Sequence, residues 1–155
     1  MQKKLVNSLE TVISGKVTDE KEFLDFYSLD SSAYSRRPRL IVFPKSIQDV
    51  KKTIQFAKKR KIPICARGGS TGLVGSSLTT GIIIDMKNFN KIKLSKNHVT
   101  VGAGVSKGEL DLILNHNKKF LGPNPSVGAF CKIGGMIANN SSGSRSLKYG
   151  SVIDN

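Results

Sequence analysis

A glycine-rich stretch at residues 67–77 has the composition of an anion-binding loop. It reads Arg-Gly-Gly-Ser-Thr-Gly-Leu-Val-Gly-Ser-Ser, with four glycines and several hydroxyl side chains behind a leading arginine. Glycine lets backbone N–H groups turn inward and approach a ligand closely, and successive inward N–H groups form an anion-binding nest. The hydroxyls add donors and Arg67 adds charge. Because the stretch directly follows an apolar run that we take as a buried strand, a diphosphate loop is favoured over a plain surface loop.

The stretch does not match either of the common nucleotide-binding motifs. No Gly-Lys-Ser/Thr closes it, which excludes a Walker A loop. Its glycine spacing is wrong for a Rossmann fingerprint, and no amphipathic helix is expected before the next apolar run at Ile82.

A second segment, from Gly122 to Gly150, is rich in Gly, Ser, Asn and Pro. Two prolines, Pro123 and Pro125, would rigidify a turn. Gly134-Gly135 precede a short apolar run, where they could let a short helix pack tightly or aim its N-terminus at a phosphate. The side chains of residues 139–142 can hydrogen-bond flat polar rings. On composition alone, a ligand segment and a turn-rich connection are equally good interpretations.

The remaining chemistry-bearing residues form no constellation. Cys65 and Cys131 are interpreted as inert thiols, and His98 and His116 lack metal-ligand spacing. We therefore predict no metal site and no catalytic residue in this chain. Residue types and spacing lead as far as a phosphate-bearing ligand held by two glycine-rich segments.

Length and composition set the class of protein. The chain has 155 residues, 38% of them apolar, which suits one globular domain and excludes a disordered tail. Two cysteines exclude a disulfide scaffold and a four-cysteine metal site from this chain alone. No apolar run is long enough to span a bilayer, and the start lacks the apolar region of a secretory signal.

The charge is strongly positive, with 25 Lys and Arg against 11 Asp and Glu, giving +14. Such a balance can indicate nucleic-acid binding. The lysines, however, are scattered along the chain, aromatic residues make up 6% and tryptophan is absent, so stacking platforms would be scarce. We therefore expect no nucleic-acid partner.

Helices and strands are predicted to alternate, which indicates a mixed α and β class whose sheet type the pattern leaves open. One helix should start at Ser46, with Asp49 completing a weak capping box, and another should follow the capping box Ser106…Glu109. Ile47, Val50, Ile54 and Ala57 fall at helical spacing and are expected to face a core. The predicted helices are 3–14, 19–27, 46–61 and 110–115, and the predicted strands are 40–43, 62–66, 81–85 and 99–103.

The two segments, in this order, resemble the flavin domain of the FAD-linked oxidases with the vanillyl-alcohol-oxidase or PCMH-type fold. The resemblance covers about residues 30–155. It includes the approach RPRLIVFPKSIQDVKKTIQFAKKRKIPICARGGSTGLVGSS and the pieces GIIIDMKNFNKI and VTVGAGVSKGELDLIL. The last part, PNPSVGAFCKIGGMIANNSSGSRSLKYGSVIDN, is similar to the D-lactate dehydrogenase and glycolate oxidase subunit branch, especially to members fused to an iron–sulfur region.

The resemblance implies FAD as the cofactor and assigns its contacts. The first segment would wrap the diphosphate, Pro125 and Ser126 would lie by the flavin or its ribityl chain, and the rest would form a second FAD-contacting segment. The implied FAD-binding residues are Gly68, Gly69, Ser70, Thr71, Gly72, Ser76, Ser77, Pro125, Ser126, Gly134, Gly135, Asn139 and Gly143.

Ser70 stands where many members of the family have glycine and where some branches attach the flavin to a histidine. If the position requires a positive φ, serine costs about 1 kcal/mol, although its hydroxyl could bond a phosphate. A serine cannot form that covalent link, so we expect a non-covalent flavin.

The family fold implied is α+β, a PCMH-type FAD-binding domain of two small α/β subdomains, here truncated at its C-terminal end. We expect a helical lead-in over 1–36 and the incomplete FAD-binding domain over 37–155. Because the family's flavin domain continues and a substrate domain follows, the chain resembles an N-terminal fragment. We expect such a fragment to bind FAD weakly by itself and its catalysis to be doubtful.

The function implied is the FAD-binding part of an oxidoreductase that oxidises a D-lactate-like or glycolate-like 2-hydroxy acid. Its partners would be FAD, the missing C-terminal part and an iron–sulfur electron acceptor. We expect a cytoplasmic location, with attachment to a membrane surface through a partner as a further expectation. The alternative is non-catalytic: a truncated flavin-domain remnant or a small basic binding protein.

Overall fold

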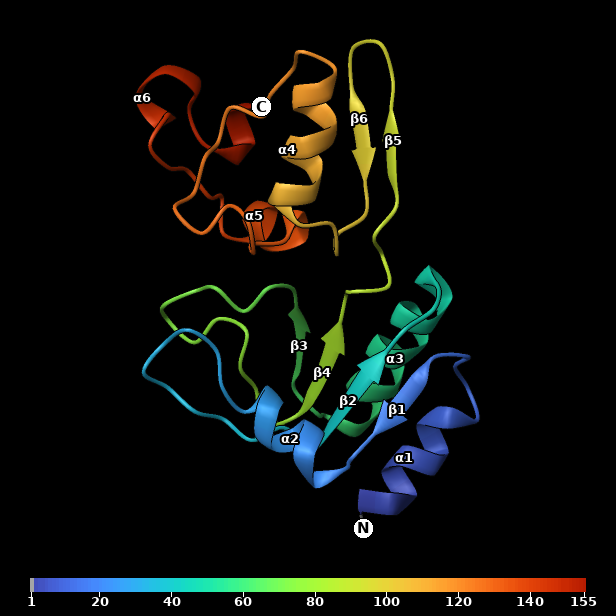
Figure 1. Ribbon diagram of the computed structural model, residues 1–155. Coiled ribbons are helices and arrows are strands. Elements are labelled where there is room, and N and C mark those ends of the chain that lie inside the picture. The colour runs from blue at the N-terminus through green and yellow to red at the C-terminus, as the bar shows by residue number, and fades with distance from the viewer. Residues whose placement is uncertain (1) are drawn as a thin grey trace. The chain divides into compact units, whose positions relative to one another are not determined.

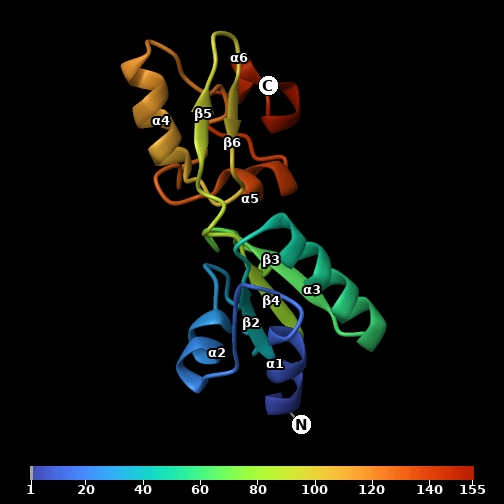
Figure 2. The ribbon, with the colours of Figure 1, turned by 90° about the vertical axis from the view of Figure 1, so that its right-hand side faces the viewer.

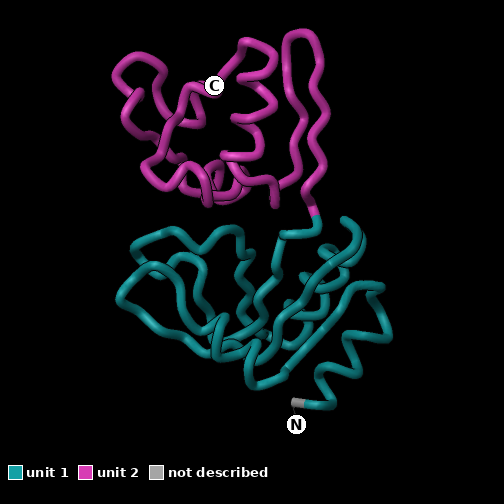
Figure 3. Tube along the Cα trace, in the orientation of Figure 1, with its two compact units in different colours: residues 1–88 teal, residues 89–155 magenta. Residues whose placement is uncertain are grey.

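A computed structural model describes residues 2–155, which form two compact units (Figure 3). The first unit extends to Asn88 and the second covers Phe89–Asn155. Each unit has its own hydrophobic core, and the two are described separately below. Two small units of mixed α and β structure are what the resemblance implies.

The first unit is built on a four-stranded sheet with the order β1-β2-β4-β3 (Figure 1). The three strands β2, β4 and β3 run parallel, and β1 pairs antiparallel with β2 at one edge. The connection from β3 to β4 contains no helix, as the sequence predicts. The strands are β1 (Lys16–Thr18), β2 (Leu40–Phe43), β3 (Ile64–Arg67) and β4 (Ile82–Asp85).

The two faces of this sheet are covered by different helices. Residues of β2 and β4 are buried on both faces because alternate side chains point to opposite sides of a strand. Leu40, Val42, Ile82 and Ile84 pack with apolar residues of α1 and α3. The intervening Ile41, Phe43 and Ile83 pack with α2 on the other face (Figure 2). The helices are α1 (Gln2–Glu10), α2 (Lys21–Tyr27) and α3 (Ile47–Arg60).

Helix α3 starts as predicted, and two of its four predicted core positions, Val50 and Ala57, contact the core. The Ser46 side chain accepts a hydrogen bond from the Asp49 N–H at 3.1 Å and caps the helix. The Asp49 carboxylate accepts from the backbone N–H groups of Ser14 and Lys45. The predicted core positions Ile47 and Ile54 are wrong, since these side chains are 65% and 42% exposed. The buried residues of the helix are Asp49, Thr53, Phe56 and Ala57, so Ala57 is confirmed as a core position.

The second unit packs short helices against a two-stranded antiparallel hairpin, β5 and β6 (Figure 1). Val105, Leu110, Leu114, Ile133 and Met136 form its core together with the partly buried apolar residues of the hairpin. Its elements are β5 (Ile92–Leu94), β6 (Val99–Val101), α4 (Lys107–His116), α5 (Ile133–Ala138), α6 (Ser146–Tyr149) and the 3-10 turn η1 (Val152–Asp154).

Helix α4 has the capping box that the sequence predicts. The Glu109 N–H donates to the Ser106 side chain and the Glu109 carboxylate accepts from the Ser106 N–H at 2.8 Å. Sequence patterning missed β1, β5 and α6, and the predicted helix 3–14 ends at Glu10. The predicted boundary between a lead-in over 1–36 and the domain over 37–155 stays a prediction. Within residues 2–155 no helix is both long and apolar enough to cross a membrane.

Candidate functional site

The glycine-rich loop at residues 68–77 leaves the end of β3 and returns to β4 (Figure 1). The first unit therefore places all seven residues predicted for the diphosphate in one loop. Its tip is open, with Leu73 and Val74 about three-quarters exposed, at 74% and 75%. Within the described part of the chain, the backbone N–H groups of residues 69–77 donate no hydrogen bond to the protein. These donors are left for a ligand or for water.

Ser70 is the most informative residue of this loop. Its φ is +56°, a left-handed conformation that favours glycine, so the serine costs about 1 kcal/mol here. Its Oγ is buried and has no hydrogen-bond partner among the residues described. A buried hydroxyl without a partner loses its hydration and gains nothing in return. The position therefore combines a strained backbone with an unpartnered hydroxyl. A hydrogen bond from Oγ to a ligand oxygen would offset this free-energy cost.

The segment at residues 30–35 braces the loop. The Ser31 N–H donates to the Ser70 carbonyl at 3.0 Å, and the Ser77 hydroxyl donates to Asp30 Oδ2 at 2.9 Å. Burial raises the pKa of Asp30, but hydrogen bonds from Ser32 and Ser77 outweigh it, and the net pKa lies below the usual value. The loop is thus held in shape by a carboxylate. The Ser77 hydroxyl is one of its braces.

Arg67 does not serve the loop in the way that we inferred from the sequence. Its side chain is buried and its guanidinium donates to the carbonyls of Tyr27 and Leu29, at 2.9 and 2.8 Å. The guanidinium also lies 4.7 Å from the centre of the Tyr27 ring. The Tyr27 hydroxyl in turn donates to Asp85, and burial followed by this hydrogen bond raises the pKa of Tyr27. Arg67 therefore ties α2 to β3 and is not a free cation for a phosphate.

The strand before the loop is also less buried than we expected. β3 is an edge strand of the sheet, and Ile64 and Ala66 are exposed. The apolar pattern of residues 62–66 could not reveal this, because a strand at an edge and one at the centre have similar compositions. The glycine density of the loop is thus not explained by a buried strand end.

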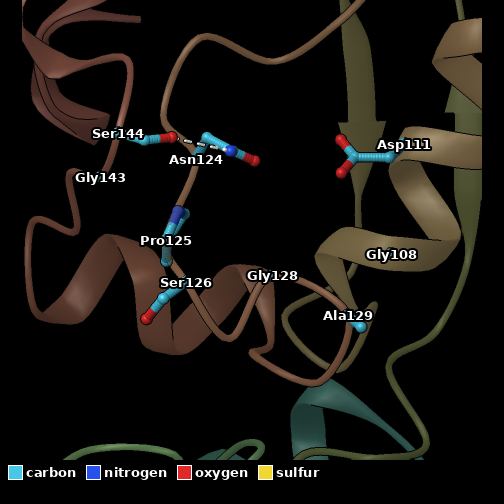
Figure 4. Close-up of a pocket in the computed structure, with 9 residues that line it drawn as sticks. All are labelled: Gly108, Asp111, Asn124, Pro125, Ser126, Gly128, Ala129, Gly143 and Ser144. Carbon is cyan, nitrogen blue, oxygen red and sulfur yellow. Dashed lines mark hydrogen bonds between the residues drawn. The ribbon is translucent and has the colours of Figure 1, made fainter.

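The second unit contains a pocket of about 520 Å³ that brings three predicted residues together. Pro125, Ser126 and Gly143 all line it, although they come from separate parts of the segment 122–150 (Figure 4). The other lining residues are Gly108, Asp111, Asn124, Gly128, Ala129 and Ser144. Glycine and alanine make up part of the wall, and the polar side chains of Asp111, Asn124, Ser126 and Ser144 make up much of the rest.

Gly143 is required by the backbone at its position. Its φ is +148°, and a Cβ there would lie 2.0 Å from the carbonyl oxygen of Asn124. The chain at residue 143 therefore passes directly against the peptide bond between Asn124 and Pro125. This close approach joins the two sides of the pocket.

The other three predicted residues lie on or next to α5 and do not line this pocket. The Gly134 N–H donates to the Ala103 carbonyl at 3.0 Å, and a Cβ on Gly134 would meet Ala103 Cβ at 2.8 Å. Gly134 thus permits close packing within the second unit. A Cβ on Gly135 would meet nothing within 4 Å. The Asn139 side chain folds back to the Gly135 carbonyl. Their contact with FAD stays a prediction.

Sequence reasoning missed a polar network beside the pocket. Lys107 is 1% exposed, and its ammonium contacts Asp111 Oδ2 at 2.5 Å and Asn124 Oδ1 at 3.1 Å. Asn124 Nδ2 donates to the Ser144 hydroxyl at 3.1 Å (Figure 4). The spacing of Lys107 and Asp111, four residues apart on one helix, was a usable signal. It was hidden because Lys107 sits inside the capping box and was interpreted only as part of it.

Both cysteines fit the inert interpretation. Cys131 is buried, and Cys65 is half-buried with its thiol near the Ser76 carbonyl. Burial raises the pKa of both thiols. A raised pKa lowers the fraction of reactive thiolate at neutral pH.

The fold is shared with solved proteins. An alkyldihydroxyacetonephosphate synthase structure superposes with a TM-score of 0.84 and 26% identity over 98% of this chain and 34% of that one. Two small α/β units, one with a braced glycine-rich loop and the other with a glycine-lined pocket, define the class as a PCMH-type FAD-binding domain. The chain belongs to the FAD binding domain family, whose sequence pattern matches residues 38–155.

Two curated relatives are similar in sequence to this chain. The glycolate oxidase subunit GlcD of Escherichia coli K12 is 34% identical over 145 residues, covering 89% of this chain. A mitochondrial D-lactate dehydrogenase [cytochrome] of Arabidopsis thaliana is 30% identical over 161 residues, covering 99% of this chain. In both cases the chain spans 28% of the length of the relative.

Proposed function

We propose that this chain is the FAD-binding part of an oxidoreductase acting on a 2-hydroxy acid, with the loop at residues 68–77 binding the FAD diphosphate. In the first unit, two features of this loop support the proposal. Its backbone N–H groups have no acceptor within the described chain, and the buried hydroxyl of Ser70 has no hydrogen-bond partner there. Both are hydrogen-bond donors, and a diphosphate offers acceptors with negative charge. Gly68, Gly69, Thr71, Gly72 and Ser76 supply the rest of this loop.

The second unit supplies the groups for the flavin itself. Pro125, Ser126 and Gly143 surround a pocket whose glycine-rich wall lets a flat ring lie against the backbone. When bound, FAD supplies the redox chemistry by accepting a hydride from the substrate. The chain's own residues hold and orient the cofactor. We assign Gly134, Gly135 and Asn139 to the same cofactor as part of the proposal.

The substrate class rests on the relatives, whose printed names are glycolate oxidase subunit and D-lactate dehydrogenase. Glycolate and D-lactate are both 2-hydroxy acids. The electrons would pass to an acceptor such as an iron–sulfur protein. We propose a non-covalent flavin, because the serine at position 70 does not form the covalent link to a flavin ring that a histidine can form.

A competition titration tests the cofactor assignment. FAD is titrated into the purified 155-residue chain by calorimetry and by quenching of flavin fluorescence, with ADP and FMN as competitors. We expect saturable 1:1 binding of FAD, displaced by ADP because ADP carries the same adenosine diphosphate portion. Absence of FAD binding up to about 1 mM, an affinity limit of roughly 4 kcal/mol, would contradict the proposal.

Two substitutions at Ser70 separate its backbone from its hydroxyl. Ser70→Gly should stabilise the ligand-free chain by about 1 kcal/mol because it relieves the positive φ. Ser70→Ala keeps that strain but removes the buried hydroxyl that has no partner, so it should also stabilise the ligand-free chain. Both should weaken FAD binding by about tenfold or more, since each removes a hydrogen bond to a charged oxygen. Urea unfolding and calorimetry measure the two effects.

Ser8→Ala is the matched control, because the Ser8 hydroxyl bonds only within α1. It should leave FAD binding unchanged. If Ser70→Ala binds FAD as tightly as Ser8→Ala, the orphaned hydroxyl does not face the diphosphate.

A further inference from the structure

The buried network beside the pocket of the second unit has features that packing alone does not explain. Lys107 is almost fully buried while Asp111, its ion-pair partner, keeps a side-chain exposure of 32%. Burying a charged ammonium is costly, and replacing a buried ion pair with apolar side chains is often neutral or stabilising. The pair is therefore weak evidence for a stabilising role, and its place beside a pocket suggests another one.

The ammonium of Lys107 fixes the orientation of two lining side chains at once. The ammonium donates hydrogen bonds to Oδ2 of Asp111 and to Oδ1 of Asn124. The Asn124 amide nitrogen is thereby directed to Ser144, to which it donates. Figure 4 shows the Asp111 carboxylate pointing across the pocket toward Asn124.

One oxygen of Asp111 remains unused. Asp111 Oδ1 accepts no hydrogen bond from any residue that the structure describes, whereas Oδ2 is engaged with Lys107. The Ser144 hydroxyl accepts from Asn124, so its own proton is free to be donated. The pocket thus presents one charged acceptor from α4 and a hydroxyl donor from the opposite wall.

We propose that Asp111 is a flavin-binding residue that accepts a hydrogen bond from the bound cofactor, and that Lys107 is the positioning residue that orients it. This inference rests on the proposed function. The matching chemistry in a flavin is an N–H or O–H donor, which is present both at N3 of the ring and along the ribityl chain. Under the proposed function the loop of the first unit holds the adenosine diphosphate portion, so we expect ADP binding to be independent of Asp111.

Asp111→Asn tests the acceptor, since it keeps the shape and changes a partly exposed side chain. The Lys107 ammonium needs an acceptor, so the oxygen of the introduced amide turns to it. The amide nitrogen then faces the N–H or O–H of the cofactor, and two donors cannot form a hydrogen bond. FAD binding should weaken by about tenfold or more. ADP binding should stay unchanged. Asp19→Asn, the same change in the first unit, is the control.

The double variant Lys107→Met with Asp111→Asn tests the positioning role. Without the ammonium, the introduced amide can rotate and present its oxygen to the cofactor. The double variant should therefore bind FAD more tightly than Asp111→Asn alone, which a merely structural lysine would not produce. Circular dichroism verifies that each variant is folded. If the double variant does not fold, the single variant Lys107→Arg is measured in its place, with Asp111 unchanged. This variant should retain FAD binding within about threefold, because arginine is also a cation that can donate hydrogen bonds to Asp111.

An FAD analogue methylated at N3 identifies the donor. If Asp111→Asn does not weaken binding of this analogue, the N3–H of the ring is the partner of Asp111. If Asp111→Asn weakens binding of the analogue as much as binding of FAD, a ribityl hydroxyl is the partner. Both results support the inference. It is overturned if Asp111→Asn binds FAD as tightly as Asp19→Asn, or if it weakens ADP by the same factor. If the double variant binds FAD no more tightly than Asp111→Asn alone, Lys107 is not a positioning residue. Failure of the unaltered chain to bind either ligand would instead overturn the proposed function.

Discussion

Gly69→Asp should reduce FAD binding by about 100-fold or more. Gly69 lies two residues beyond the end of β3, beside Ser70, and its N–H has no acceptor in the described chain. An aspartate there places a carboxylate next to the diphosphate. Like charges in contact cost several kcal/mol, and each 1.4 kcal/mol is a factor of ten in affinity. Calorimetric titration of FAD into the variant measures the loss.

Gly69→Asn separates the charge from the size of the new side chain. Because it is nearly isosteric with aspartate and neutral, it should retain much more affinity than Gly69→Asp. The difference between the two should shrink as salt is raised, since exposed charges are screened. Equal losses in both variants, or no loss in Gly69→Asp, would show that the diphosphate lies elsewhere.

Gly143→Ala should destabilise the second unit by about 3 kcal/mol and abolish the pocket. A left-handed backbone disfavours any Cβ, and this one would lie 2.0 Å from the Asn124 carbonyl oxygen. The neighbouring atom is backbone, so no side chain can simply move aside. The segments 124–126 and 143–144 should separate. Urea unfolding followed by circular dichroism measures the stability, and flavin fluorescence measures the binding.

Gly135→Ala is the matched comparison for stability. Gly135 lies within α5, has no positive φ, and a Cβ there meets nothing within 4 Å. Alanine is favoured over glycine inside a helix by up to about 1 kcal/mol. The variant should therefore be as stable as the parent or more so. If Gly143→Ala were equally harmless, the close approach to Asn124 would not exist in solution.

The elements with strong local signals could be predicted from the sequence. The runs Leu40–Phe43 and Ile82–Asp85 are apolar enough to be fully buried, and Ser46 and Ser106 mark helix starts through their own side chains. Strand β1 was missed because three residues, Lys16–Thr18, carry too short a pattern. The exposed Ile47 and Ile54 show that helical spacing alone does not decide which face is buried.

The candidate site was predictable where residue type reflects the backbone. Gly143 and Ser70 both have a positive φ, and at residue 143 the glycine in the sequence is itself a signal of such a backbone. The burial of Arg67 and Lys107 could not be predicted in full, because each cation also has partners far away in the sequence. Arg67 bonds the carbonyl of Tyr27, 40 residues earlier, and Lys107 bonds Asn124, 17 residues later.

The strand order of the first unit has a consequence for synthesis. β4 is the last of the four strands to leave the ribosome, yet it lies in the middle of the sheet, between β2 and β3. Until Asp85 emerges, the nascent chain can pair only β1 with β2, and β3 has no neighbour. An open edge of apolar strand is a template for wrong pairing. The sheet of the first unit can therefore be completed only after β4 has emerged, and until then the edge of β2 that β4 covers stays open.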